Sequence, residues 1–327
     1  MEDNRLLIVE NLRTYFHTPE GIVRSIDGVT FSVDRGEALA LVGESGCGKT
    51  VTSLSLMGLL PETAELTADR LEFNGRDLLA MDREQRRLLR GSGLAMIFQE
   101  PMTSLNPVYR IGRQIGEVFT CHHPEMSGEE IHRRSVDMLR QVGVPDPEER
   151  LKVYPHQLSG GLRQRVIIAI ALAAGAPLVI ADEPTTALDV TIQVQILQLI
   201  RKLQAERQMS IILITHDFGV VSQLAQRVAV MYAGKIVEEG PFEDVFRRPL
   251  HPYTELLILS IPGVRVKRGE KLISIAGAVP DPLRFPEGCR FHPRCPHAAE
   301  RCRREEPPEV RTGNRRVSCF LRGEAEL

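Results

Sequence analysis

The octapeptide GESGCGKT, residues 43–50, restricts the fold of this chain more than any other stretch of its sequence. It matches the pattern G-x-x-x-x-G-K-[ST] of a phosphate-binding loop, and it lies between a strand-like run and a helix-like pattern. In such a loop backbone N–H groups cradle phosphate, the lysine reaches the β and γ oxygens, and the threonine hydroxyl binds Mg²⁺. The residues predicted to hold ATP and its Mg²⁺ here are Gly43, Glu44, Ser45, Gly46, Cys47, Gly48, Lys49 and Thr50.

The remaining pattern up to about residue 240 predicts an α/β fold in which helices wrap a buried parallel sheet. Residues 192–203 place their apolar side chains on one helical face, and residues 131–142 do the same after a capping box formed by Ser127 and Glu130. The apolar runs typical of strands are residues 29–33, 38–42, 178–181, 211–215 and 228–232.

Composition excludes several classes of protein. The 327 residues carry 41 Lys and Arg against 43 Asp and Glu, a net charge of −2, so no extended basic surface for nucleic acid is expected. Apolar residues make up 43% of the chain, which excludes wholesale disorder. The sequence contains no run of about 20 apolar residues, the length that a membrane-spanning helix needs. Its acidic start, MEDNRLLIVE, lacks the apolar core of a signal peptide. The chain is expected to stay in the cytoplasm.

A second motif, the apolar run at residues 178–181 followed by Asp182 and Glu183, resembles a Walker-B strand. Asp182 would bind the Mg²⁺ shell, and Glu183, one residue later, would polarise the attacking water. The sequence therefore predicts hydrolysis of the nucleotide as well as its binding.

A third motif, LSGG at residues 158–161, provides a second anion-binding helix start. One nucleotide does not need two such starts on one chain, whereas two chains that face each other head to tail do. At this point the chain resembles the ATP-binding-cassette (ABC) ATPases, although Leu162 stands where many members have glutamine. The further residues that match the family are Gln99 (the Q-loop, with a role in catalysis and at Mg²⁺), Ala187-Leu188-Asp189 (the D-loop), His216 (the switch histidine), and Phe16, or otherwise Tyr15, for adenine stacking. Ser159, Gly160 and Gly161 would face the ATP held by the partner subunit, and Asp189 is expected among the nucleotide-binding residues.

A closer resemblance is to the ATP-binding subunits of dipeptide, oligopeptide and nickel importers. It is carried by IFQEPMTSLNP, YPHQLSGG, ADEPTTALDVT, LITHD and the segment HPYT at residues 251–254. It implies a P-loop ABC fold with a RecA-like core, an antiparallel β subdomain and a helical subdomain at about residues 100–176. Residues 1–240 would form the nucleotide-binding domain and residues 241–327 a C-terminal extension.

The same resemblance implies partners and a mechanism. The partners would be two integral membrane permease subunits, a second ABC ATPase subunit, either a paralogue of this one or an identical copy, and an extracytoplasmic solute-binding protein. The chain would lie peripherally on the cytoplasmic face of the plasma membrane, with residues 101–116 against the permeases. The alternative is a non-transport ABC ATPase acting on nucleic acid or ribosomes, disfavoured by the single phosphate loop and the lack of a heptad run. A metabolic P-loop kinase would have no use for LSGG.

The cysteines of the proline-rich tail suggest a metal site. Cys289, Cys295, Cys302 and Cys319 are spaced C-x₅-C-x₆-C-x₁₆-C, looser than the C-x₂₋₄-C of structural zinc sites. We therefore expect a structural [4Fe–4S] cluster, because such a tail has little core of its own. Zinc, with His292 or His297 as substitute ligands, and two disulfides are the alternatives. Cys47 and Cys121 are isolated and are expected to have no redox role.

Overall fold

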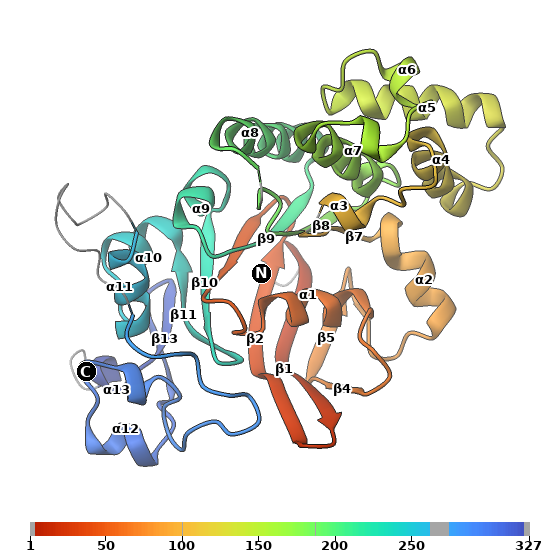
Figure 1. Ribbon diagram of the computed structural model, residues 1–327. Coiled ribbons are helices and arrows are strands. Elements are labelled where there is room, and N and C mark those ends of the chain that lie inside the picture. Colours follow the sequence, from red (N-terminus) through yellow and green to blue (C-terminus); the bar gives the residue numbers. More distant parts are fainter. Residues whose placement is uncertain (1–3, 100, 187, 262–274, 324–327) are drawn as a thin grey trace. The chain divides into compact units, whose positions relative to one another are not determined.

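The computed structural model describes residues 4–99, 101–186, 188–261 and 275–323, which form two compact units (Figure 1). The first unit consists of the described parts of Met1–Val33, Ala38–Leu79 and Leu213–Leu327, and the second of Asp34–Glu37 and Ala80–Ile212. These limits differ from the expected division at residue 240 and from the helical subdomain at residues 100–176, both of which stay predictions.

Two long strands begin the first unit and form a sheet with the order β2-β1-β5-β6, in which β4 also pairs with β1. Strand β1 runs antiparallel to both β4 and β5. Alternate residues of the second half of β2, among them Val29, Phe31 and Val33, are buried, as one covered face of a sheet requires. This part of the fold agrees with the expected antiparallel β subdomain. The strands are β1 (Arg5–Thr18), β2 (Gly21–Asp34), β4 (Ala64–Thr67), β5 (Arg70–Phe73) and β6 (Arg76–Asp77).

The other sheet has in the first unit the order β12-β13-β11-β10-β3-β9 and in the second unit β9-β8-β7. Strands β3 and β10 are parallel, and so are β7 and β8. Every residue of β3, β7, β8 and β9 is buried, which explains why these strands are uninterrupted apolar runs in the sequence. The predicted strands are thereby confirmed as β3 (Ala38–Val42), β8 (Leu178–Asp182), β9 (Ser210–Thr215) and β10 (Arg227–Tyr232), with β7 (Leu94–Ile97) and β11 (Lys235–Pro241) beside them.

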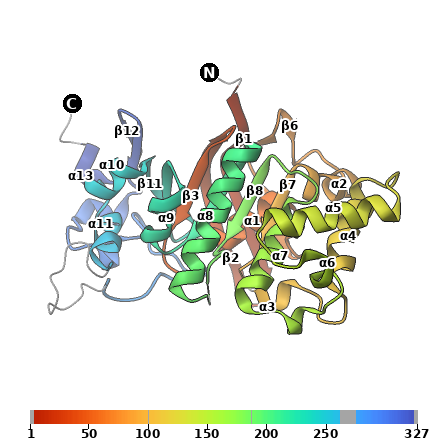
Figure 2. The ribbon, with the colours of Figure 1, turned by 90° about the horizontal axis from the view of Figure 1, so that it is seen from above.

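Helices gather in the second unit, where α4, α5, α6 and α7 lie side by side (Figure 2). The predicted cap of α5 is present, because the Ser127 side chain accepts a hydrogen bond from the Glu130 backbone N–H at 3.2 Å. Helix α4 approaches α5 closely at Gly116, where an added Cβ would lie 3.2 Å from Ile131 Cγ2. The helices of this unit are α2 (Arg83–Ser92), α3 (Pro101–Ser104), α4 (Ile111–His122), α5 (Gly128–Gln141), α6 (Pro147–Arg150), α7 (Gly160–Leu172) and α8 (Val190–Arg207), with a 3₁₀ helix at Pro155–Gln157.

The C-terminal segment belongs to the first unit, and two of its strands extend the main sheet. Strand β13 (Arg315–Ser318) pairs antiparallel with β11, and β12 (Glu309–Thr312) pairs with β13. Between β13 and β11, Arg315 forms an ion pair with the fully buried Glu238, and Arg316 forms one with Glu239. The tail is therefore held by sheet pairing and buried ion pairs. The helices of the first unit are α1 (Lys49–Met57), α9 (Phe218–Leu224), α10 (Phe242–Arg247), α11 (Pro252–Leu259), α12 (Glu300–Arg304) and α13 (Phe320–Gly323), with a 3₁₀ helix at His292–Arg294.

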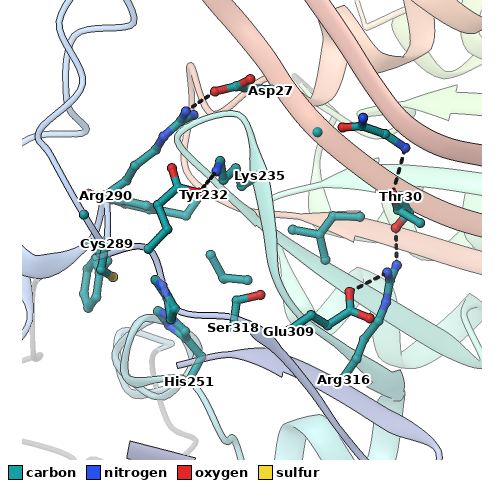
Figure 3. A pocket seen from close by; sticks show the side chains of 18 of the residues that line it. Asp27, Thr30, Tyr232, Lys235, His251, Cys289, Arg290, Glu309, Arg316 and Ser318 are labelled. Atoms are coloured by element: carbon teal, nitrogen blue, oxygen red, sulfur yellow. Dashed lines mark hydrogen bonds and ion pairs between the residues drawn. The ribbon is translucent and has the colours of Figure 1, made fainter. Parts of the chain in front are cut away.

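A pocket of about 310 Å³ lies in the first unit between the β1–β2 strands, β11 and the C-terminal segment (Figure 3). Its charged walls pair with one another: Arg290 reaches Asp27, and Arg316 reaches Glu309 and the Thr30 carbonyl oxygen. The polar lining is thus engaged in holding the tail to the β subdomain.

None of the described helices is both long enough and apolar enough to cross a membrane.

Candidate nucleotide-binding and hydrolysis site

The phosphate loop connects β3, which ends at Val42, to α1, which begins at Lys49. Gly48 caps α1 with a φ of 108°, and an added Cβ there would lie 2.6 Å from the Ser25 carbonyl oxygen. Only glycine fits this conformation and this space. The end of the loop at Gly48 is therefore closely packed against the backbone of β2 at Ser25.

Lys49 is buried, and its Nζ donates hydrogen bonds to the carbonyl oxygens of Gly43 at 2.8 Å and Glu44 at 2.9 Å. Its ammonium group is thereby held across the loop.

Cys47 is fully buried in the loop, and this burial raises the pKa of its thiol. A buried, protonated thiol is unreactive, which agrees with the absence of a redox role expected for Cys47.

In the second unit, the carboxylate proposed for hydrolysis lies directly after β8. Asp182 ends this strand and is buried, whereas Glu183 has a φ of 45°, in the left-handed region. Glu183 Oε2 accepts hydrogen bonds from Gln99 Nε2 at 2.9 Å and from Thr186 Oγ1 at 2.8 Å. A non-glycine residue in this conformation is uncommon and tends to occur at functional sites. The structure thus brings together Gln99 and Glu183, which are 84 residues apart in the sequence.

The LSGG segment opens α7 as the sequence predicts. Ser159 is the N-cap, and its Oγ accepts from the Leu162 backbone N–H at 3.4 Å. Gly161 packs against α8, since an added Cβ would lie 2.9 Å from Ile192 Cγ2. Asp189 caps α8 through the Ile192 N–H at 3.0 Å. Ala187 of the expected D-loop lies outside the described residues, and Gly160 is exposed beside Ser159.

Two more expected site residues lie in the first unit. His216 follows β9 and is exposed. Phe16 is half-buried on β1, opposite Ala64 of β4. Its neighbour Tyr15 donates its hydroxyl hydrogen bond to Asp27 at 2.5 Å, which leaves Phe16 as the better candidate for adenine stacking.

The [4Fe–4S] cluster predicted for the tail is wrong. Among the described residues, no group of three or more His, Cys, Asp or Glu side chains could hold a metal ion, so zinc is not supported either. The tail cysteines form no disulfide with one another, and burial raises the pKa of the thiols of Cys289, Cys295 and Cys319. His292 Nδ1 is instead within hydrogen-bond distance of the Cys289 carbonyl oxygen, at 3.0 Å.

Four residues that contact the expected site were missed in the sequence. Thr186 bonds to Glu183, and the buried Gln164 of α7 donates to the Pro184 carbonyl oxygen at 2.7 Å, fixing the turn after Glu183. Tyr253 and Arg294 of the C-terminal segment contact Glu44 of the phosphate loop. The sequence signals near them are the segment ADEPTTALDVT, the glutamine inside the LSGG helix and the segment HPYT, and none of these identifies the residue that is contacted.

Comparison with known proteins identifies two family regions in the chain. The ABC transporter family matches residues 26–186, and the family "oligopeptide/dipeptide transporter, C-terminal region" matches residues 237–302. The chain is 48% identical to the dipeptide transport ATP-binding protein DppD of Haemophilus influenzae, over 96% of this chain and 94% of that protein. It is 50% identical to the oligopeptide transport ATP-binding protein AppD of Bacillus subtilis, over 97% of this chain and 96% of that protein.

Solved structures give the same result for the fold. The bacterial ABC transporter cassette MJ0796, solved as a dimer, is similar with a TM-score of 0.65 at 26% identity, over 72% of this chain and 98% of that one. The cbiO1 protein of Clostridium perfringens is similar with a TM-score of 0.64 at 27% identity, over 75% of this chain and 92% of that one. The chain therefore belongs to the ABC transporter family of ATPases, in the group of dipeptide and oligopeptide transport ATP-binding proteins.

Proposed function

We propose that this chain hydrolyses ATP to drive the import of dipeptides or oligopeptides through a membrane ABC transporter. The observation that carries the proposal is the match to peptide-transport relatives along nearly the whole chain, C-terminal region included, together with a complete set of hydrolytic motifs. The alternative of an ABC ATPase acting on nucleic acid or ribosomes has no such support.

The phosphate loop would bind the triphosphate. The cradle formed by Gly46, Gly48 and the start of α1 directs backbone N–H groups to phosphate oxygens, and Lys49 adds a positive charge. Phe16 would stack on the adenine ring. The donors Thr50, Gln99 and Asp182 offer hydroxyl, amide and carboxylate oxygens, which fit Mg²⁺ because this hard cation prefers oxygen ligands. When bound, Mg²⁺ would neutralise charge on the β and γ phosphates.

Glu183 would orient and polarise the attacking water, and His216 would contact the γ-phosphate. The hydrogen bonds from Gln99 and Thr186 hold the Glu183 carboxylate in one orientation, in which it would polarise the water. Ser159, Gly160, Gly161 and Asp189 of one subunit would face the ATP held by the other. The dimeric state in which the related cassette MJ0796 was solved supports this arrangement.

The similarity to peptide-transport ATP-binding proteins supports the proposed partners. Two permease subunits would span the membrane, an extracytoplasmic binding protein would deliver the peptide, and a paralogous ATPase subunit would complete the dimer. This chain would lie at the cytoplasmic face of the inner membrane, peripherally bound through the permeases.

Affinity purification of the tagged chain from its native host tests this assembly. We expect two integral membrane proteins and a second ABC ATPase to purify with it, and the chain to leave the membrane fraction when the permease genes are deleted. Purification with ribosomes or nucleic acid, unchanged by that deletion, would contradict the proposal.

A further inference from the structure

Glu44, the second residue of the phosphate loop, is bound by two residues of the C-terminal segment. Arg294 Nη1 and Nη2 donate to its carboxylate oxygens at 2.7 and 2.9 Å, which is the bidentate fork of an arginine–carboxylate pair. The backbone N–H of Glu44 donates to Tyr253 Oη at 2.9 Å. The segment thus holds both the side chain and the backbone of one loop residue, more than 200 residues away in the sequence.

These contacts are built into the fold. The Arg294 side chain is only 4% exposed, and its Nε also donates to the Ala276 carbonyl oxygen at 2.8 Å. Hydrogen bonding to Glu44 raises the pKa of Arg294, so its charge is constant. Tyr253 is buried against Tyr232, with ring centroids 4.6 Å apart, and Phe291 packs on both rings. Tyr253 cannot leave Glu44 without opening this ring cluster, and Arg294 Nη1 also donates to Tyr232 Oη of the cluster at 3.4 Å.

The location of Glu44 gives the contacts a consequence for nucleotide binding. The peptide between Gly43 and Glu44 donates its N–H to Tyr253 Oη and accepts from Lys49 Nζ at the Gly43 carbonyl oxygen. Tyr253 thereby also fixes one of the two acceptors of the lysine, the second being the carbonyl oxygen of Glu44. The Glu44 carboxylate is a negative charge in a loop that must accept a polyanion. An unpaired carboxylate at this position would repel the phosphates, whereas the Arg294 fork compensates the charge and holds it in place.

We propose that Arg294 and Tyr253 are positioning residues of the ATP site, through which the C-terminal segment holds the phosphate loop ready for nucleotide. Arg294 compensates the charge of Glu44, and Tyr253 fixes the Gly43–Glu44 peptide, whose carbonyl oxygen is one of the two Lys49 acceptors. The inference rests on the proposed role of the loop in binding ATP. It gives the C-terminal region a function at the nucleotide site in addition to any role in transport.

A double-mutant cycle on the full-length chain tests the inference, with ATP affinity read from displacement of trinitrophenyl-ATP in Mg²⁺. Arg294→Met keeps the aliphatic bulk but removes the fork, and it should weaken ATP binding by about tenfold, the scale of one charged hydrogen bond. In the Glu44→Gln background the same change should weaken binding by less than about threefold, because no carboxylate remains to be compensated. Arg294→Lys should recover part of the loss.

Matched controls separate this role from general destabilisation. Arg304→Met removes an exposed ion pair with Glu300 in the same segment and should leave ATP affinity unchanged. Tyr253→Phe should weaken binding about threefold, since it leaves the Glu44 N–H without its acceptor. If Arg294→Met does not fold, judged by near-ultraviolet circular dichroism, Tyr253→Phe and Arg294→Lys still decide the question.

Equal effects of Arg294→Met in both backgrounds, or unchanged affinity in Arg294→Met and Tyr253→Phe alike, would overturn the inference. Failure of the proposed function has a different signature: the wild-type chain would then bind no ATP, and Lys49→Ala would not differ from it.

Discussion

At the scale of single residues, the geometry of Glu183 explains how one carboxylate is held for hydrolysis. Its backbone lies in the left-handed region, and one of its oxygens is engaged by Gln99 and Thr186. Left-handed backbone at a non-glycine residue costs of the order of 1 kcal/mol and persists where the surroundings enforce it. Here the turn is enforced from behind by the buried Gln164, which bonds to Pro184.

The first prediction concerns this residue. Glu183→Gln preserves the shape and keeps an acceptor for Gln99 and Thr186, but it removes the base. ATP should bind as in the wild type, while steady-state hydrolysis should fall by about 10²–10⁴-fold. Phosphate release by the purified protein measures the effect, and hydrolysis close to that of the wild type would exclude Glu183 as the base.

The site residues differ in how far the sequence could predict them. Lys49, Asp182 and Glu183 belong to contiguous motifs that also show their structural setting, a strand end or a helix start. Thr186, Gln164, Tyr253 and Arg294 act through contacts that only the folded chain creates. Arg294 lies 250 residues from Glu44, and no local pattern encodes such a pair.

At the scale of elements, helix α11 begins with a buried histidine that makes stability depend on pH. His251 is the N-cap, and its Nδ1 accepts from the Tyr253 backbone N–H at 3.0 Å. Complete burial lowers the pKa of His251 from 6.5 to about 3. The unfolded chain therefore binds this proton below about pH 6.5, whereas the folded chain stays neutral down to about pH 3, so stability falls as the pH falls through that window.

The second prediction follows from this sign. His251→Asn keeps a good N-cap but removes the titrating group. Between pH 7.5 and 5.5 the free energy of unfolding of the wild type should fall by about 1.4 kcal/mol through His251. The variant lacks this contribution, so its free energy of unfolding should fall by about 1.4 kcal/mol less than that of the wild type. Urea unfolding at the two pH values provides the measurement. Parallel losses in both proteins would show that His251 is not the group responsible.

The third prediction concerns the start of helix α7. If the LSGG segment serves the ATP of the opposite subunit, Ser159→Glu should repel that γ-phosphate while leaving the chain's own phosphate loop intact. The isolated chain should bind ATP normally, and the ATP-driven dimer should be lost in size-exclusion chromatography with light scattering. Weaker ATP binding by the monomer would mean that Ser159 acts on its own nucleotide.

The elements themselves were predicted unequally. Buried parallel strands such as β3 and β8 and capped helices such as α5 have distinct periodicities and boundaries, and these predictions are confirmed. The C-terminal hairpin β12–β13 was missed, because its strands are short, charged and stabilised by Glu238 and Glu239 of a distant strand. Because the hairpin was not predicted, the tail lacked any visible support, and the cysteine spacing was interpreted as a metal site. In the structure, sheet pairing provides that support.

At the scale of the whole molecule, the predicted ABC ATPase fold is confirmed by the ABC transporter family match over residues 26–186 and by the similarity to solved ABC cassettes at TM-scores of 0.65 and 0.64. The proposal that the cargo is a peptide rests on the similarity to peptide-transport proteins and not on any pocket of this chain. The contacts of Lys49, Gln99 and Glu183 support the proposed binding and hydrolysis of ATP, and we propose that the permeases and the binding protein select the cargo.

The most direct test of the central claim, that hydrolysis by this chain drives peptide import, is uptake of a radiolabelled dipeptide and a labelled pentapeptide by host cells lacking its gene. Plasmid-borne wild-type protein should restore uptake of at least one of them. Glu183→Gln, present at the same level in the membrane fraction, should not. Restoration by the Glu183→Gln variant, or uptake of both peptides that is unaffected by the deletion, would contradict the account.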